Sequence, residues 1–220
     1  MLNSVIFLGR KNCIFSKKLH ILLKKNSKKL LYVENLNKNK KNNLNKINNF
    51  DYLFSFRSYQ ILKRQTLKKI NNLAINFHPG SPKYRGIGCT NFAIYNNEKI
   101  YGATAHLIDD KIDHGKIIDV VEFKIKEKDS LEKLLNKTHK QMFILATKVI
   151  KNIIKDRNYY SNTRLKYKWS KKLWKRKDLE RLCKININDS SQLVKKKIRS
   201  TNYKSYKPYI LFKNYKFKLC

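Results

Sequence analysis

The sequence predicts an α/β protein built on an open, mostly parallel sheet with flanking helices, followed by a short basic C-terminal extension. Short runs of β-branched and aromatic residues alternate with segments of helical apolar spacing, in the order strand, helix, strand, strand, helix, strand. The 220 residues are 41% hydrophobic, which suits one buried core with some appended material. In such a sheet, ligands gather beyond the carboxyl ends of the strands.

The first half of the chain contains four apolar runs of strand length and two segments of helical spacing. We expect strands at residues 4–9, 30–33, 51–56 and 73–77, and helices at residues 15–25 and 59–70. Residues 35–49 are almost entirely Asn, Lys and Leu, a composition typical of a surface helix or a loose loop. The fourth strand is followed directly by His78-Pro79-Gly80, so these residues should lie where ligands gather.

The second half begins with a predicted β-hairpin, in which apolar runs at residues 100–108 and 117–125 flank a polar loop. Asp129 and Ser130 can cap the amphipathic helix that follows. The apolar face of that helix is traced by Leu131, Leu134, Leu135, Thr138, Met142, Leu145, Val149 and Ile153. The helix should cover one side of the sheet and complete a main domain of residues 1–155.

Residues 156–220 form the extension, with 20 Lys or Arg against four acids and with interleaved Tyr and Trp. Basic residues with aromatics can bind nucleic acid through stacking and charge. They can equally pack as a small satellite against the main domain, and we favour this interpretation.

Other protein classes are disfavoured by the composition. No apolar run reaches the ~18 residues that a membrane helix requires, and the opening residues 1–8 are too short and interrupted for a signal peptide. The cysteines Cys13, Cys89, Cys183 and Cys220 form no C-x-x-C pair, so neither a zinc knuckle nor a disulfide framework is indicated. We expect a cytoplasmic protein with reduced thiols, no metal and no membrane partner.

The net charge of +36 would ordinarily indicate nucleic acid. However, 42 of the 51 basic residues are Lys. Arg is better suited to nucleic acid, because its guanidinium forms bidentate hydrogen bonds with phosphates and bases. Lys scattered among Asn is also what AT-rich coding produces. We therefore interpret most of the charge as solvated surface and do not expect a nucleic-acid partner, with a polyanion-binding surface as the alternative. The charge still favours an anionic small substrate through long-range steering.

Residues 74–115 depart from this composition. Eleven of the fourteen Gly, Pro and Ala residues of the chain lie in this window, and residues 76–122 carry five Lys or Arg against six Asp or Glu. Scarce residues and acids therefore gather where particular backbone conformations and particular charges are needed.

A candidate site follows from three residues of this window. Asn76 and His78 stand one residue apart at the end of an apolar strand, so both side chains project from the same face of an extended backbone. Pro79 and Gly80 then impose a non-helical path. Asp113 lies in the acidic turn of the predicted hairpin. Each feature alone is more often structural, and it is their combination that indicates chemistry.

The order and spacing of four motifs resemble those of the formyltransferases that depend on N10-formyltetrahydrofolate. The motifs are Asn76-Phe77-His78-Pro79, Pro82-Lys83-Tyr84-Arg85-Gly86, Gly102-Ala103-Thr104-Ala105-His106 and Asp113-His114-Gly115. The resemblance is good over residues 50–150, whereas the first 50 residues resemble the family only in their general pattern. The resemblance implies a Rossmann-like sheet and an enzyme that transfers a formyl group to an amine.

The resemblance also implies that Asn76, His78 and Asp113 are the catalytic residues, and their chemistry suits this reaction. An amine that attacks a formyl carbon creates an oxyanion, to which the Asn76 amide and a protonated His78 can donate hydrogen bonds. Asp113 can hold the imidazole in its charged form and accept the proton of the amine, directly or through water.

The resemblance further implies where the two substrates bind. The formyl donor N10-formyltetrahydrofolate, with no metal, is expected against Ser58, Tyr59, Gln60, Ile61 and Leu62 and against Ile108, Asp109 and Asp110. The acceptor, a small and anionic amine, is expected at Pro79, Gly80, Tyr84, Arg85 and Gly86.

Three acceptor classes are compatible with the resemblance. Methionyl-tRNA formyltransferases add a separate C-terminal domain, for which the residues after 155 are too few. Glycinamide ribonucleotide enzymes read Ser-Leu-Leu-Pro after His-Pro, whereas this chain reads Gly80-Ser81-Pro82. That loop, with residues 175–179 and 198–203, is closer to enzymes acting on nucleotide-linked amino sugars. We therefore expect a sugar N-formyltransferase.

Two other functions stay open. The fold could have lost catalysis and bind RNA through its basic tail, or it could hydrolyse formyl-folate with water as the nucleophile. A homodimer is also compatible with the sequence, which does not decide the oligomeric state.

Overall fold

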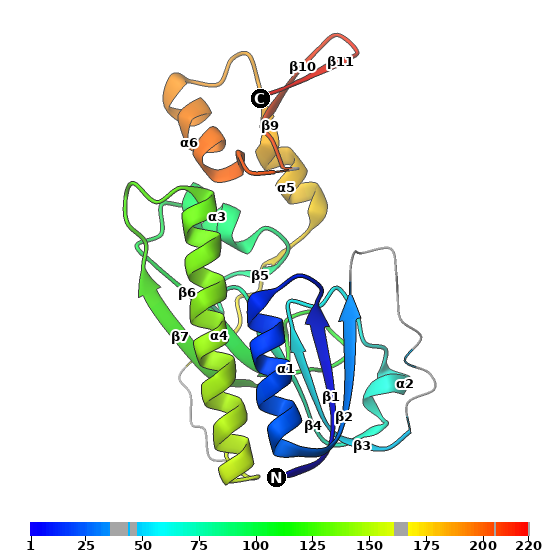
Figure 1. The fold of residues 1–220 in the computed structure, drawn as a ribbon. Coiled ribbons are helices and arrows are strands. Elements are labelled where there is room, and N and C mark those ends of the chain that lie inside the picture. The colour runs from blue at the N-terminus through cyan, green and yellow to red at the C-terminus, as the bar shows by residue number, and fades with distance from the viewer. Residues whose placement is uncertain (36–43, 45–47, 161–166, 205, 220) are drawn as a thin grey trace.

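A six-stranded sheet forms the centre of the molecule, with strand order β2-β1-β3-β4-β6-β7 (Figure 1). The structure is a computed structural model that describes residues 1–35, 44, 48–160, 167–204 and 206–219. The strands are β1 (Leu2–Arg10), β2 (Ser27–Asn35), β3 (Phe50–Phe56), β4 (Ile70–His78), β6 (Ile100–Leu107) and β7 (Ile117–Lys124). The pairs among β1 to β4 are parallel, while β6 and β7 are antiparallel to their neighbours. The predicted α/β sheet and its terminal hairpin are confirmed.

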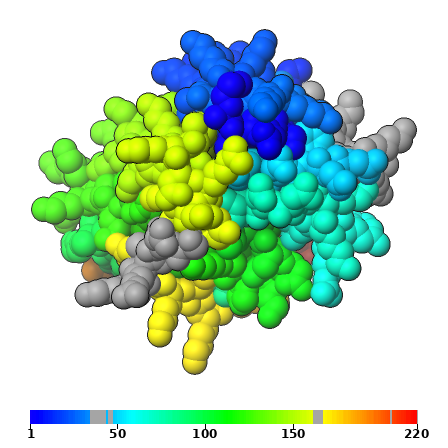
Figure 2. Space-filling model, turned by 90° about the horizontal axis from the view of Figure 1, so that it is seen from below, coloured from blue at the N-terminus to red at the C-terminus, as the bar shows by residue number. Residues whose placement is uncertain are grey.

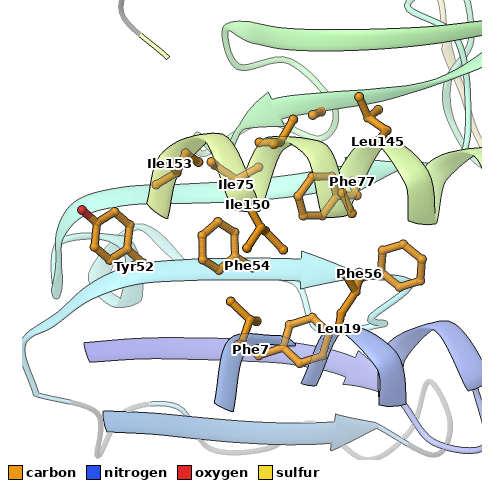
Figure 3. Close-up of a cluster of buried hydrophobic side chains, with 14 of the residues drawn as sticks. Phe7, Leu19, Tyr52, Phe54, Phe56, Ile75, Phe77, Leu145, Ile150 and Ile153 are labelled. Carbon is orange, nitrogen blue, oxygen red and sulfur yellow. The ribbon is translucent and has the colours of Figure 1, made fainter. Parts of the chain in front are cut away.

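Helices α1 (Ile14–Asn26) and α4 (Leu131–Lys155) cover one face of the sheet (Figure 1). Figure 3 shows Phe7, Phe54 and Phe77 from the strands facing Leu19 and Ile150 from these helices. All of these side chains are fully or almost fully buried. This cluster is the main core.

The opposite face of the sheet is also buried. Because side chains alternate along a strand, Val5 and Phe7 of β1 join the main core while Ile6 and Leu8 join a second cluster. Leu53 and Ile70 contribute to that second cluster. Burial on both faces explains why the first strands read as continuous apolar runs rather than as alternating ones.

The long helix α4 begins and packs as predicted. The Ser130 hydroxyl oxygen accepts a hydrogen bond from the Lys133 backbone N–H at 3.2 Å, which caps the first turn. The predicted apolar positions are buried except for Leu135, which is partly buried. At its far end, Arg157 donates to the Met1 carbonyl at 3.4 Å, and Figure 2 shows the end of α4 beside the N-terminus.

The predicted helix over residues 59–70 is largely wrong. Only α2 (Arg64–Leu67) is helical, and residues 58–63 form an irregular segment. Arg57 adopts a positive φ of 56°, which turns the chain at the end of β3. The Ser58 hydroxyl then accepts a hydrogen bond from the Gln60 N–H at 3.0 Å, a local turn that competes with helix formation.

The residues after α4 fold against the upper part of the sheet domain (Figure 1). They contain β8 (Leu173–Trp174), α5 (Arg176–Cys183), β9 (Lys184–Ile185), α6 (Ser191–Thr201), β10 (Tyr209–Phe212) and β11 (Tyr215–Lys218). The short helix α3 (Cys89–Tyr95), which the sequence analysis missed, provides their platform. Phe92 of α3 packs with Leu179 of α5 in a third buried cluster. The domain boundary at residue 155 stays a prediction.

Some sequence expectations fall partly outside the part of the chain that the structure describes. Cys13, Cys89 and Cys183 are free and buried, whereas Cys220 lies outside. Of the Asn- and Lys-rich tract at residues 35–49, only residues 35, 44, 48 and 49 are described. Within the described residues, no helix is long and apolar enough to cross a membrane.

His139 on α4 is expected to make stability depend on pH. Burial, with the charges of Arg57 and Arg10, lowers the pKa of His139 to about 3. Between pH 6.5 and 3 the unfolded chain therefore binds a proton at this residue that the folded chain does not, so the free energy of unfolding falls as the pH falls. Urea unfolding at pH 7 and pH 5 should show a smaller decrease for His139→Gln than for the unmodified protein. Lys140→Gln, which removes a charge from the same helix but no histidine, should keep the full decrease; equal decreases in all three proteins would contradict the assignment.

Candidate functional site

The candidate site lies where β4 ends beside β6. In the antiparallel register of these strands, Asn76 is opposite His106 and His78 is opposite Thr104. Asn76 and His78 share one face of β4, as an extended backbone requires. His78 and His106 are each only 3% exposed. The strand ending and its neighbour therefore hold an amide and two imidazoles at one buried position.

Asp113 reaches the same position from the loop that follows β6. One carboxylate oxygen, Oδ2, lies 3.3 Å from His78 Nδ1, and the other, Oδ1, lies 3.6 Å from His106 Nε2. The Gly86 backbone N–H donates to Oδ2 at 2.9 Å. The structure thus brings Asn76, His78 and Asp113 together, with His106 among them.

The loop that carries Asp113 is clamped by Arg85. The guanidinium donates from Nε to the Asp113 carbonyl at 2.6 Å and from Nη2 to the Ile112 carbonyl at 3.0 Å. Its Nη1 donates to the Ser170 carbonyl at 3.1 Å. Asp113 has a positive φ of 45°, a left-handed conformation that Asp tolerates better than most residues. Arg85, expected at the acceptor, is therefore engaged in holding the carboxylate loop and the C-terminal segment.

His106 orients the amide of Asn76. Its Nδ1 lies 2.7 Å from the Leu107 carbonyl, which can only accept, so this nitrogen carries the proton in the neutral ring. The other ring nitrogen, Nε2, then accepts from the Asn76 amide Nδ2 at 3.2 Å. One N–H of that amide is used by His106, and within the described part of the chain the second is left for a further acceptor.

The surroundings of His78 act on its charge in opposite directions. Its Nε2 donates to the Tyr84 carbonyl at 2.8 Å, and its Nδ1 lies on the side of Asp113. Burial lowers the pKa of His78 below its ordinary value, although the Asp113 carboxylate acts in the opposite direction. A proton that reaches Nδ1 would be stabilised by the carboxylate beside it.

Asp113 is ionised. Burial by itself would raise the pKa of the carboxyl, but His78, His106 and the Gly86 N–H together hold it well below its ordinary value. A fixed negative charge therefore faces Nδ1 of His78.

A cavity of about 520 Å³ opens beside this cluster, a size typical of small-molecule sites. Asn76, His106 and Asp113 line it, whereas His78 is not among the lining residues. All the residues predicted to bind the donor also line it, namely Ser58, Tyr59, Gln60, Ile61, Leu62, Ile108, Asp109 and Asp110. The irregular path of residues 58–63 is what turns the first of these groups toward the cavity.

Of the residues predicted at the acceptor, only Gly86 lines the cavity. Gly80 lies against the imidazole, because a Cβ there would be 2.5 Å from His78 Nε2. The Tyr84 ring is buried in the third cluster, and its hydroxyl donates to Glu98 at 2.7 Å. The Pro79 carbonyl accepts from the Tyr101 hydroxyl at 3.0 Å. These residues shape the loop and pack it, rather than presenting side chains to the cavity.

The C-terminal segment supplies a wall of the cavity that the sequence analysis missed. Leu173, Trp174, Lys175 and Arg176 line it, and β8 pairs in parallel with β5 (Arg85–Gly86). Gly86 has a positive φ of 89°, and a Cβ there would be 2.2 Å from the Trp174 carbonyl. The signal in the sequence was that both tryptophans of the chain lie in this basic segment.

The cavity walls suit an organic ligand. Within the residues that the structure describes, no group of three or more His, Cys, Asp or Glu side chains could hold a metal ion. A planar, partly apolar molecule suits the cavity, because its walls combine Ile61, Leu62 and Ile108 with backbone and carboxylate groups.

The chain is similar in sequence to known proteins of one family. Residues 15–150 match the family model described as formyl transferase. The bifunctional polymyxin resistance protein ArnA of Wigglesworthia glossinidia brevipalpis is 33% identical over 155 residues, which cover 70% of this chain and 22% of that protein. A methionyl-tRNA formyltransferase of Finegoldia magna is 26% identical over 152 residues, 69% of this chain and 48% of the relative.

A solved structure is similar over nearly the whole chain. It is WlaRD, a sugar 3N-formyl transferase in the presence of dTDP and 5-N-formyl-THF. It matches with a TM-score of 0.75 and 25% identity, over 97% of this chain and 84% of that one. The chain thus spans less than half the length of the two curated relatives, but most of the length of this solved enzyme.

Proposed function

Because the chain belongs to the formyl transferase family, we propose that it transfers a formyl group from N10-formyltetrahydrofolate to the amine of a nucleotide-linked amino sugar. The observation that carries the proposal is the meeting of Asn76, His78 and Asp113 at the edge of one cavity. An amide donor, a neutral imidazole and an ionised carboxylate are the groups that amine acylation needs.

In this proposal, His78 and Asp113 act together as the proton acceptor. The neutral imidazole offers Nδ1 as a base, and the imidazolium that forms is stabilised by the carboxylate 3.3 Å away. Since Asp113 lines the cavity and His78 does not, the proton of the amine would reach Nδ1 by way of the Asp113 carboxylate. Burial lowers the pKa of His78, which favours the proton-free base.

Asn76 acts as the hydrogen-bond donor in the same proposal. N10-formyltetrahydrofolate supplies an electrophilic formyl carbon. The Asn76 N–H that His106 does not use can stabilise negative charge on a carbonyl oxygen in the cavity, and the orientation of the amide is set before binding. His106 is therefore a positioning residue.

The donor would bind between the two loops that line the cavity on the side of β3 and β6, residues 58–62 and 108–110. The acceptor would bind toward Gly86 and the C-terminal wall. Lys175 and Arg176 line that wall and suit a diphosphate. The similarity to WlaRD supports an amino-sugar acceptor, whereas the similarity to a methionyl-tRNA formyltransferase supports the alternative.

A panel of acceptors tests the proposal. The purified protein would be incubated with N10-formyltetrahydrofolate and, separately, with dTDP-linked 3-amino and 4-amino sugars, glycinamide ribonucleotide and methionyl-tRNA. We expect mass spectrometry to find a formyl group only on a nucleotide sugar. Formylation of the tRNA alone would overturn the sugar assignment, and formate release without any acceptor would indicate a hydrolase.

A further inference from the structure

Trp169 contacts the catalytic cluster from outside the part of the chain that matches the family model. Its indole N–H donates to the Gly115 carbonyl at 2.7 Å. Its ring centroid lies 5.9 Å from that of His78 and 5.1 Å from that of His106, with interplanar angles of 72° and 90°. One side chain therefore touches both imidazoles and holds the loop two residues after Asp113.

The residues beside Trp169 line a different space. Tyr167, Lys168 and Ser170 line an outer groove of about 430 Å³, together with residues 81–83, Ile100 and Glu122. Trp169 lines neither this groove nor the substrate cavity. Its partly buried ring packs on the histidines, whereas the residues on either side of it in the sequence line the groove.

We infer that Trp169 is a positioning residue that closes the catalytic cluster to water on the side of the outer groove and anchors the loop that carries Asp113. The inference rests on the proposed function and adds a residue that keeps the transfer selective for the amine. Without this ring, the groove would open toward His78 and His106.

Water at the cluster would have a definite chemical consequence. A water oxygen would add to the formyl carbon, the bond from that carbon to N10 of the folate would break, and a proton from water would pass to N10. The products are formate and tetrahydrofolate, and no oxidant or reductant is needed. The same base that accepts the proton of the amine would serve this side reaction.

Two variants separate the two roles of the indole. Trp169→Ala removes the ring and its N–H, and we expect kcat for transfer to fall on the order of 10²-fold because the loop is misplaced. The ratio of formate release to transfer should rise by at least tenfold in the same variant, since water now enters. Trp169→Phe keeps a ring but loses the N–H, so it should lose part of the transfer rate while formate release stays low.

A second measurement does not depend on activity. The pKa of His78 would be measured by an NMR titration of histidine-labelled protein. The His78→Asn variant identifies which ring signal belongs to His78. Exclusion of water contributes to the lowered pKa of His78, so Trp169→Ala should move that pKa up toward the ordinary 6.5, and Trp169→Phe should not. This titration decides the role of the ring even if none of the acceptors is formylated.

The control is Tyr167→Ala, which removes an aromatic ring from the same segment on the side of the outer groove. It should leave the ratio of formate release to transfer and the His78 titration unchanged. If Trp169→Ala does not fold, as judged by circular dichroism, Trp169→Leu provides the same comparison. An unchanged His78 titration and an unchanged ratio in the folded variant would overturn the inference.

Discussion

Replacing His78 by alanine is expected to lower kcat/KM for formyl transfer by about 10²- to 10⁴-fold, the range that general acid–base groups typically contribute. The variant loses the Nδ1 base and leaves the Asp113 carboxylate, whose side chain is only 11% exposed, without the imidazole that would pair with it after proton transfer. The rate would be followed by the release of tetrahydrofolate with the best acceptor of the panel.

His20→Asn is the matched control for this experiment. His20 stacks on Tyr32, with ring centroids 4.3 Å apart, and does not line the cavity. Its replacement should change kcat/KM less than twofold, because it is remote from the proposed chemistry. If a folded His78→Ala protein kept transfer within tenfold of the unmodified protein, the proposed base would be wrong. Circular dichroism and the thermal midpoint would show that both variants are folded.

Replacing Asn76 by aspartate is expected to lower kcat by at least about 10²- to 10³-fold, as the loss of an oxyanion donor typically does. The change keeps the shape of the side chain but removes both N–H donors. It also places a second carboxylate near Asp113, where negative charge is already fixed. Single-turnover measurements with bound donor and saturating acceptor would report this step directly.

Asn72→Asp makes the same substitution on the same strand at an exposed position. It should leave kcat unchanged, which separates the effect of the site from the effect of an added charge on β4. If Asn76→Asp raised KM and left kcat unchanged, the amide would bind the ground state as strongly as the transition state and would not be the proposed donor.

The sequence predicted most of the sheet and helix framework because local patterns reflect burial. Residues 131–153 show a helical period, and α4 buries that face on the sheet. The failure at residues 59–70 has a local cause and a tertiary one. The turn at Arg57 and Ser58 ends β3 and sends the chain along the cavity, where residues 58–62 meet the loop after β6.

The proposed acceptor side of the site could not be derived from residues 79–86 alone. Sequence order placed Tyr84 and Arg85 beside the histidine, and we expected them to face the substrate. In the structure, the tyrosine ring packs in the third cluster and the guanidinium binds three backbone carbonyls. The side chains at that end of the cavity come from residues 173–176, which are remote in sequence.

The sequence by itself determined the residue types of the site, since an Asn-x-His at a strand end and an aspartate in a Gly-containing turn are local features. Only the tertiary structure decided how these groups are charged and enclosed. The antiparallel pairing of β4 with β6 places His106 against Asn76, and the loop brings Asp113 to His78. Burial then lowers the pKa of His78, and Trp169 reaches it from the extension. Proximity, dielectric environment and exclusion of water depend on contacts between distant segments, and no local pattern encodes them.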